Sequence, residues 1–210
     1  MAKLMTVLIV LERLRAHDIT MDTRFRVSEY AWREHGAMST GSHMFLPINS
    51  EVAGRDLLQG AVIVAANDAR VMLPGGIAGA GEDGPGQRIS SADLARLTRH
   101  LIMTYPEFYP VYSRRQFPFN NRTQMNRNPL LRGFAGADGV KAGHTDESGY
   151  GLIGSAVLNG ERRIIVFNGL PTMASRNTEA QRLMRSAFND YAISEIASAG
   201  DVVGEAQVRL

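Results

Sequence analysis

The sequence predicts an α/β (α+β) fold in which helices cover an antiparallel sheet, and three observations support this prediction. Asn159-Gly160 joins two apolar runs within 151–168, a strong signature of a type I′ β-hairpin. Apolar residues then recur at helical spacing over 180–191, which predicts a long amphipathic helix on one face of the sheet. The apolar run that begins at Leu4 predicts a buried N-terminal helix reaching about Ala16.

The composition is that of a globular protein with room for one full domain and a sizeable core. Of its 210 residues, 44% are apolar and 21% charged, which excludes a disordered chain, a collagen and a multi-span membrane protein. The absence of cysteine excludes a disulfide framework, a thiolate metal site and a cysteine nucleophile. The five histidines lack metal-ligand spacing, so we predict no metal and no cofactor. Only the pI of about 9.1 would support nucleic-acid binding. Basic residues alternate with acidic ones along the chain, which is typical of a solvated surface and not of a nucleic-acid-binding patch.

The shorter elements follow from periodicity and turn residues. Apolar residues at helical spacing predict a core helix over 55–64, whereas six glycines over 75–87 predict a loop with little to bury. Ser90 or Ser91 is a suitable N-cap for the helix that follows. In chain order, the remaining expectations are a strand over 22–27, a helix over 27–35, a polar loop over 36–41, an extended segment over 44–48, a break at Asn67 and Asp68 with a helix resuming over 69–72, an aromatic corner over 105–112, a strand over 140–145 beside the hairpin, and an edge strand over 199–210.

The use of lysine is unusual. Of the 23 basic residues only Lys3 and Lys141 are lysines, and the rest are arginines. A buried lysine can lose its proton and an arginine cannot. A position that remains lysine in an arginine-rich chain is therefore a candidate functional position, although two chance survivors would give the same count.

Three stretches have the order and spacing of the S-x-x-K, S-x-N and K-T-G motifs of penicillin-binding serine acyl-transferases. More narrowly, the chain resembles the D-alanyl-D-alanine carboxypeptidases, the low-molecular-mass penicillin-binding proteins, over essentially its whole length. This resemblance implies a β-lactamase/transpeptidase-like fold, with an antiparallel sheet covered by terminal helices plus a helical cluster. The motif stretches are Lys3-Leu4-Met5-Thr6, Ala65-Ala66-Asn67-Asp68 and Lys141-Ala142-Gly143-His144-Thr145, and the supporting stretches are 44–46, 56–60, 67–69, 136–139 and 149–151.

The resemblance implies an acyl-enzyme mechanism. In the family, a serine attacks the peptide bond between two D-alanines, a neutral lysine takes its proton, and water then hydrolyses the ester. Lys3 matches the base and Asn67 the amide of S-x-N. Lys141 matches the cation that binds the terminal carboxylate, Gly143 allows close backbone approach, and the N–H of His144 matches the second oxyanion donor.

Each of the three motifs keeps its nitrogen group and lacks its hydroxyl. The nucleophilic serine would stand three residues before Lys3, ahead of Met1, and is absent from the printed chain. Ala65 occupies the position of the family serine in S-x-N, and Ala142 that of the threonine in K-T-G. A methyl group neither attacks a carbonyl nor relays a proton, so we expect no acylation of this chain.

The resemblance also implies how the chain is organised. Residues 1–195 correspond to a penicillin-binding, transpeptidase-like catalytic domain without its N-terminal strands and without a segment near 79–87, and residues 196–210 to the start of a truncated C-terminal β domain. The family works in the periplasm or cell envelope, and membrane attachment would come only through a C-terminal helix that is missing here. Without a signal peptide, this chain is expected to be cytoplasmic if expressed as given.

Two functional hypotheses follow. The first is a serine-type D-Ala-D-Ala carboxypeptidase of peptidoglycan synthesis and remodelling, inactive as given. The alternative is a non-catalytic, degenerate penicillin-binding fold that binds cell-wall peptides. Both predict a peptidoglycan stem peptide ending in D-Ala-D-Ala as partner, with β-lactams as ligands of intact relatives and no nucleic acid. Both require Lys3 and Lys141 to meet in one cleft that reaches Asn67.

Overall fold

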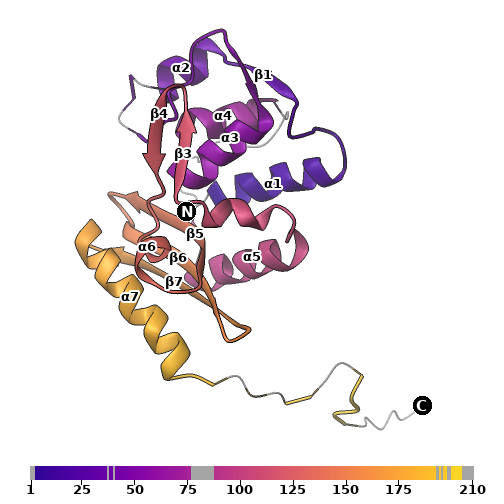
Figure 1. Cartoon of the computed structure of the whole chain (residues 1–210), viewed down its shortest axis with the longest axis vertical. Helices are drawn as coiled ribbons and strands as arrows, with labels where there is room; N and C mark the ends of the chain where they lie inside the picture. Colours follow the sequence, from indigo (N-terminus) through magenta and orange to yellow (C-terminus); the bar gives the residue numbers. More distant parts are fainter. Residues whose placement is uncertain are drawn as a thin grey trace.

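The protein consists of a cluster of helices beside a three-stranded sheet (Figure 1). Its structure, a computed structural model, describes residues 3–36, 38–39, 41–76, 88–192, 194, 196–197 and 200–204. The elements in order are α1 (Lys3–Arg15), β1 (Arg24–Arg26), α2 (Glu29–His35), β2 (Glu51–Ala53), α3 (Gly54–Gln59), the π-helical η1 (Gly60–Val64), α4 (Asn67–Gly76), α5 (Ser91–Thr104), the 3₁₀ turn η2 (Tyr109–Ser113), β3 (Gln116–Phe119), β4 (Arg122–Met125), α6 (Leu130–Gly133), β5 (Ala137–Thr145), β6 (Gly149–Leu158), β7 (Glu161–Leu170) and α7 (Met173–Asn189).

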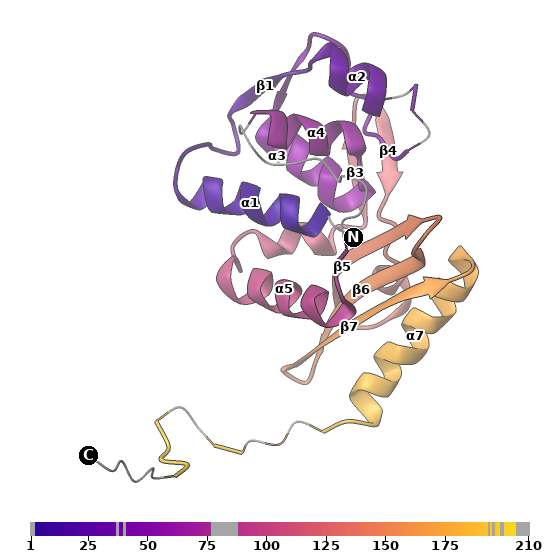
Figure 2. The same cartoon turned by 180° about the vertical axis from the view of Figure 1, so that it is seen from behind.

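Strands β5, β6 and β7 form an antiparallel sheet in that order, so β5 is an edge strand. Successive side chains point to opposite faces, and on β6 Ile153 belongs to the core of the helical cluster while Leu152 packs with α7. Helix α7 therefore covers one face, and α5 with the helical cluster covers the other (Figures 1 and 2). In the β6–β7 turn, Asn159 (φ 52°) and Gly160 (φ 79°) are both left-handed, which confirms the predicted hairpin.

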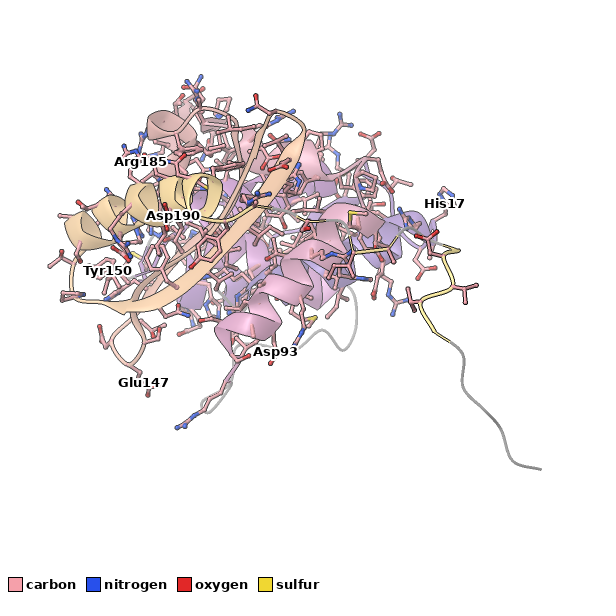
Figure 3. All side chains as sticks on the ribbon, turned by 90° about the horizontal axis from the view of Figure 1, so that it is seen from below. His17, Asp93, Glu147, Tyr150, Arg185 and Asp190 are labelled. Carbon is pink, nitrogen blue, oxygen red and sulfur yellow. The ribbon has the colours of Figure 1, made fainter. Side chains whose placement is uncertain are left out.

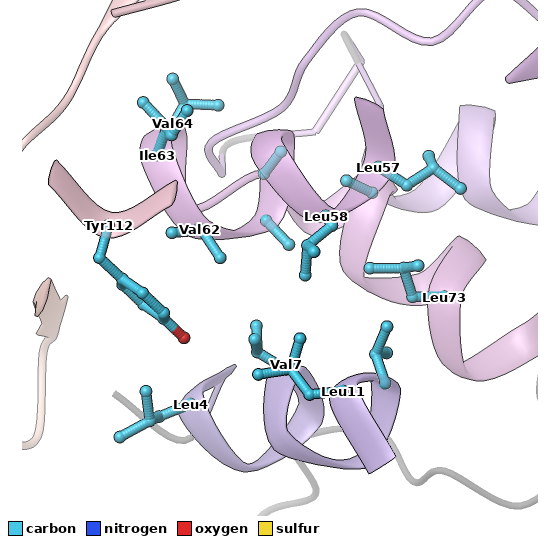
Figure 4. Close-up of a cluster of buried hydrophobic side chains, with 14 of the residues drawn as sticks. Leu4, Val7, Leu11, Leu57, Leu58, Val62, Ile63, Val64, Leu73 and Tyr112 are labelled. Carbon is cyan, nitrogen blue, oxygen red and sulfur yellow. The ribbon is translucent and has the colours of Figure 1, made fainter. Parts of the chain in front are cut away.

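The main core forms where α1 packs against α3, η1 and α4. Apolar residues of α1 recur every three or four positions, and this places Leu4 and Leu11 in the interior. Figure 4 shows Leu4 at the end of this cluster nearer Tyr112, and Leu11 at the end nearer Leu57 of α3 and Leu73 of α4. The predicted N-terminal helix is thus confirmed, and its packing brings the beginning of α1 close to β5 (Figure 1).

The core helix predicted over 55–64 forms, but its geometry changes halfway from α to π. It ends at Ala65, which adopts a left-handed conformation with φ of 61°. A π-helical turn and a strained non-glycine residue both occur frequently at functional sites. The helical conformation is interrupted just before Asn67, and not at Asn67 and Asp68 as predicted. Helix α4 begins at Asn67, and Asp68 lies in its first turn, where an acidic residue is favoured.

Several other predictions agree with the structure. The positions of three further elements agree with the prediction: β1 and α2 lie within their predicted segments, and β5 includes and extends the strand predicted over 140–145. The aromatic corner over 105–112 packs into the core. The side chain of Ser90 accepts a hydrogen bond from the N–H of Asp93, which confirms Ser90 as the N-cap of α5.

The C-terminal helix is displaced from its predicted span. Helix α7 runs from Met173 to Asn189, so it begins before residue 180 and ends before Tyr191, whose side chain is exposed. The early start has a local cause, because Thr172 and Ser175 form a reciprocal capping box. Apolar periodicity located the covering helix, and capping set its beginning.

The hairpin of β3 and β4 was not predicted from the sequence, and neither were the strand β2 and the helix α6. Pro118 lies inside β3, and a proline argues against a strand except at an edge. The hairpin turn uses Asn120 (φ 48°) and Asn121 (φ 56°), since asparagine tolerates the left-handed region better than most residues.

Two predicted segments fall partly outside the described residues. Gly75 and Gly76 belong to α4 rather than to the predicted loop, and the remainder of that loop, 77–87, is outside the described ranges. Of the edge strand predicted over 199–210, only 200–204 is described, and it forms no strand. No helix in the described ranges combines the length and apolar character needed to cross a membrane.

Candidate functional site

A cavity of about 650 Å³ lies where the helical cluster meets the sheet, and it has the size of a typical ligand site. The structure brings together all seven residues that the sequence analysis assigned to a site: Lys3, Ala65, Asn67, Lys141, Ala142, Gly143 and His144. We call this cavity the cleft. Its remaining lining residues are Gly41, Ser42, Met125, Asn126, Arg127, Pro129, Arg132, Thr145, Tyr150, Met173, Arg176 and Asn177.

Lys141 forms the inner wall of the cleft. It lies on β5, its side chain is only 6% exposed, and its Nζ donates hydrogen bonds of 3.0 Å to the carbonyl oxygens of Ala61 and Val62 on η1. Burial lowers the pKa of Lys141 well below its ordinary value, and the positive charges of Lys3 and Arg127 lower it further. Lys3 and Lys141 are therefore close enough to repel one another, although one starts a helix and the other lies on a strand.

Asn67 also lines the cleft as the first residue of α4, and the chain around residues 41–46 holds it in place. Its backbone N–H donates to the carbonyl oxygen of Ser42 at 2.6 Å, and Gly41 packs so closely that an added Cβ would lie 2.2 Å from the Asn67 Nδ2. The adjacent Asp68 is fully buried and accepts hydrogen bonds from the backbone N–H of Met44 at 3.0 Å and of Leu46 at 3.3 Å. Burial raises the pKa of the Asp68 carboxyl, and these N–H donors partly oppose that rise.

Two methyl groups line the cleft at the hydroxyl positions of the S-x-N and K-T-G motifs. Ala65, at the end of η1, is 9% exposed, and Ala142, on β5, is 8% exposed. Neither can donate a hydrogen bond or relay a proton. Among the described residues, the aliphatic hydroxyls that line the cleft belong to Ser42 and Thr145, and the Thr145 Oγ1 lies 2.6 Å from the Oγ of Ser148.

The outer part of the cleft follows the edge strand β5. As an edge strand, β5 leaves one row of backbone groups unpaired within the sheet, and such a row can bind an extended peptide. Gly143 and His144 lie on this edge, and the exposed His144 ring sits 4.0 Å from the Tyr150 ring. Within the described residues, no group of three or more His, Asp or Glu side chains could hold a metal ion.

Arg176 is a site residue that sequence reasoning missed. It lies on α7, is 5% exposed, and its guanidinium sits 5.8 Å over the Tyr150 ring (Tyr150 is labelled beside α7 in Figure 3). Its terminal nitrogen donates weakly to the carbonyl oxygen of Arg127 at 3.5 Å, while its Nε has no acceptor among the described residues. Burial lowers the pKa of Arg176. A buried donor without an acceptor is costly, so this guanidinium is prepared for an anion that enters the cleft.

The fold places the chain in the class of penicillin-binding proteins and confirms the predicted transpeptidase-like architecture. It is similar to penicillin binding protein 5 of Haemophilus influenzae, with a TM-score of 0.83 and 32% identity over 89% of this chain and 62% of that chain. It is also similar to penicillin binding protein 6B of Escherichia coli, with a TM-score of 0.84 and 35% identity over 95% of this chain and 72% of that chain.

A profile for D-alanyl-D-alanine carboxypeptidase matches residues 1–84 and 79–171. The D-alanyl-D-alanine carboxypeptidase DacD of Escherichia coli is 35% identical over 237 residues, covering 99% of this chain and 61% of that protein, and DacA of Haemophilus influenzae is 31% identical over 99% of this chain and 60% of its own length. The chain belongs to the D-alanyl-D-alanine carboxypeptidase family. It spans about three fifths of the length of these curated relatives.

Proposed function

We propose that the cleft binds the C-terminal end of a peptidoglycan stem peptide, D-Ala-D-Ala, in the cell envelope. One observation carries this proposal: Lys3, Asn67 and Lys141, which are far apart in the sequence, line the same cavity as the buried Arg176. A terminal carboxylate would be held by Arg176 and by Lys141, because no carboxylate among the described lining residues compensates Arg176, and a bound carboxylate would favour the ammonium form of Lys141. The peptide backbone would extend along β5, and the Asn67 amide would hydrogen-bond to it.

The chemistry of the family is hydrolysis through an acyl-enzyme, with Lys3 in the position of the base. In this chain Ala65 and Ala142 remove two hydroxyls from the cleft while leaving its nitrogen groups in place. We propose that the 210-residue polypeptide binds the peptide terminus and turns it over poorly or not at all. This inference rests on the two internal alanines, whatever residues precede or follow the chain.

Isothermal titration with a short peptide ending in D-Ala-D-Ala tests the binding function. The same peptide with a C-terminal carboxamide serves as ligand control, and it should bind at least tenfold more weakly because it lacks the charge that Lys141 and Arg176 neutralise. Lys141→Met keeps the length of the side chain and removes the amine, and it should cause a similar loss. Arg99→Met, on α5 outside the cleft, is the matched control. Equal affinity of the acid and the amide would contradict the proposal.

A second candidate function, a catalytically active carboxypeptidase, is favoured by Ser42, a hydroxyl that lines the cleft next to Asn67. Release of D-alanine from the same peptide, measured with and without Ser42→Ala, distinguishes the two. Turnover that depends on Ser42 would replace the binding function by an enzymatic one.

A further inference from the structure

The cleft carries more positive charge than one peptide carboxylate can neutralise. Five of its lining residues are lysine or arginine, and no Asp or Glu is among the described residues that line it. These cations affect one another, because Arg127 lowers the pKa of both Lys141 and Arg176. A cleft with one sign of charge and low-dielectric walls favours ligands of the opposite charge.

The cations form two groups at different depths. Lys141 and Arg176 are buried at the inner end, whereas Arg127 and Arg132 are exposed on the stretch from the end of β4 to α6. No ion pair joins Arg127 or Arg132 to a carboxylate anywhere in the described part of the chain. Elsewhere on the surface, arginines such as Arg182 pair with a carboxylate of their own helix. Arg127 and Arg132 therefore form a rim of charge, which we call the arginine rim.

The buried and exposed groups are linked through Arg176. Its terminal nitrogen donates to the backbone oxygen of Arg127, and its Nε has no acceptor in the described ranges although the residue is only 5% exposed. One carboxylate at the inner end can satisfy Arg176 and Lys141, but it leaves the arginine rim unmatched. A second carboxylate on the same ligand would meet the rim, where arginine offers paired donors to a carboxylate.

We propose that the cleft selects peptides with two carboxylates, one at the C-terminus and a second on a side chain that precedes the two terminal residues, with the arginine rim binding the second. This proposal rests on the proposed function, because the terminal carboxylate is the group that places the peptide in the cleft. Met125 and Met173, both partly exposed, also line the cleft and provide adaptable apolar contact for the backbone between the two charges.

The test uses three acetylated tripeptides, X-D-Ala-D-Ala, in which X is Glu, Gln or Lys. We expect the Glu peptide to bind about tenfold more tightly than the Gln peptide in low salt, and the Lys peptide to bind most weakly. Arg132→Glu should abolish or invert this order, and it should weaken the Gln peptide, which keeps only the terminal carboxylate, much less than the Glu peptide. Arg185→Glu makes the same charge change on the exposed side of α7, away from the cleft lining, and should preserve the order (Figure 3).

The outcomes separate this proposal from the function on which it rests. Equal, measurable affinities for the Glu and Gln peptides overturn the selection of two carboxylates and leave terminal recognition intact. No binding of any of the three peptides overturns both. A third outcome combines two results: the Glu peptide binds no more tightly than the Gln peptide, and inorganic phosphate at equal concentration displaces the Glu peptide from the wild type but not from Arg132→Glu. The arginine rim would then be a general anion site, and the proposed selection of peptides with two carboxylates would be wrong.

Discussion

The Nζ of Lys141 donates a 3.0 Å hydrogen bond to the carbonyl oxygen of Val62, and this contact joins the edge strand of the sheet to the π-helical turn η1. A second bond of equal length goes to Ala61. A neutral amine has two N–H donors, and here two carbonyls accept them. The lysine is thus held without any acidic partner, which is consistent with its lowered pKa.

Peptide binding should be linked to proton uptake at Lys141. Because the pKa of Lys141 is lowered in the empty cleft, the amine is partly or fully neutral above that pKa, and a bound carboxylate favours the ammonium form. Affinity for a peptide acid should therefore fall as pH rises, by at most about tenfold per pH unit for one proton. In the described part of the chain, the charges that act on this amine are those of Lys3 and Arg127, both cationic, and His144 lies further along β5.

Titration calorimetry in two buffers of different ionisation enthalpy measures this uptake directly. Lys141→Met should remove both the uptake and the slope, whereas His144→Gln, which leaves the amine in place, should preserve them. An affinity that rises with pH, or an unchanged slope in Lys141→Met, would exclude the linkage.

Penicillin should leave the 23.0 kDa polypeptide without a stable covalent adduct, because Ala65 and Ala142 offer no hydroxyl to relay a proton during acylation. Restoring the motifs, with Ala65→Ser, Ala142→Thr and a serine placed ahead of Met1, should return part of the acylation. Intact-protein mass spectrometry detects the adduct, and peptide mapping locates it. An adduct on the unaltered chain, at Ser42 for example, would show that a hydroxyl already in the cleft acts as nucleophile.

Gly41→Ala should weaken peptide binding more than it lowers stability. The added Cβ would lie 2.2 Å from the Asn67 Nδ2, so the amide must move, while Gly41 itself is exposed and has no left-handed φ. We expect about a tenfold loss of affinity with a small change in Tm, since an exposed glycine contributes little packing. Gly204→Ala, where a Cβ would meet nothing within 4 Å, is the control. Unchanged affinity in Gly41→Ala would show that the position of the Asn67 amide is unimportant for binding.

How far the sequence predicts the site depends on the kind of signal each residue carries. Lys3 and Lys141 stand out because lysine is otherwise absent, and the motif spacing adds Asn67. Arg176 carries no such signal: it is one arginine among many, and its burial beside Tyr150, with no acceptor for its Nε among the described residues, arises only from the tertiary structure. The charge of the cleft is therefore a tertiary property that composition and periodicity do not contain.

The fold, like the site, can be predicted from the sequence only in part. Apolar periodicity and Asn159-Gly160 predict the sheet and its covering helix, because burial of one face determines these elements. The hairpin of β3 and β4 is decided by contacts with the rest of the protein, since the Gln124 side chain donates to the backbone oxygen of His43 at 3.1 Å and the Asn120 side chain to that of Phe45 at 3.1 Å. Local sequence gives little indication of a strand that depends on such distant partners.

The buried Asp68 should make stability depend on pH in the opposite direction to a surface carboxylate in an ion pair. Its pKa is raised in the folded protein because burial outweighs the N–H donors of Met44, Leu46 and Ala69. Between the unfolded pKa of about 3.9 and the raised folded value, the folded state binds more protons than the unfolded state, so this group's contribution to stability falls as pH rises. Asp68→Asn has no titrating group there. The free energy of unfolding of the wild type minus that of the variant, measured with urea between pH 4 and 7, should therefore decrease as pH rises.

Ser42→Ala, close in space and without a titrating group, should give a constant difference. A difference for Asp68→Asn that grows with pH would mean that the backbone donors stabilise the carboxylate more than burial destabilises it.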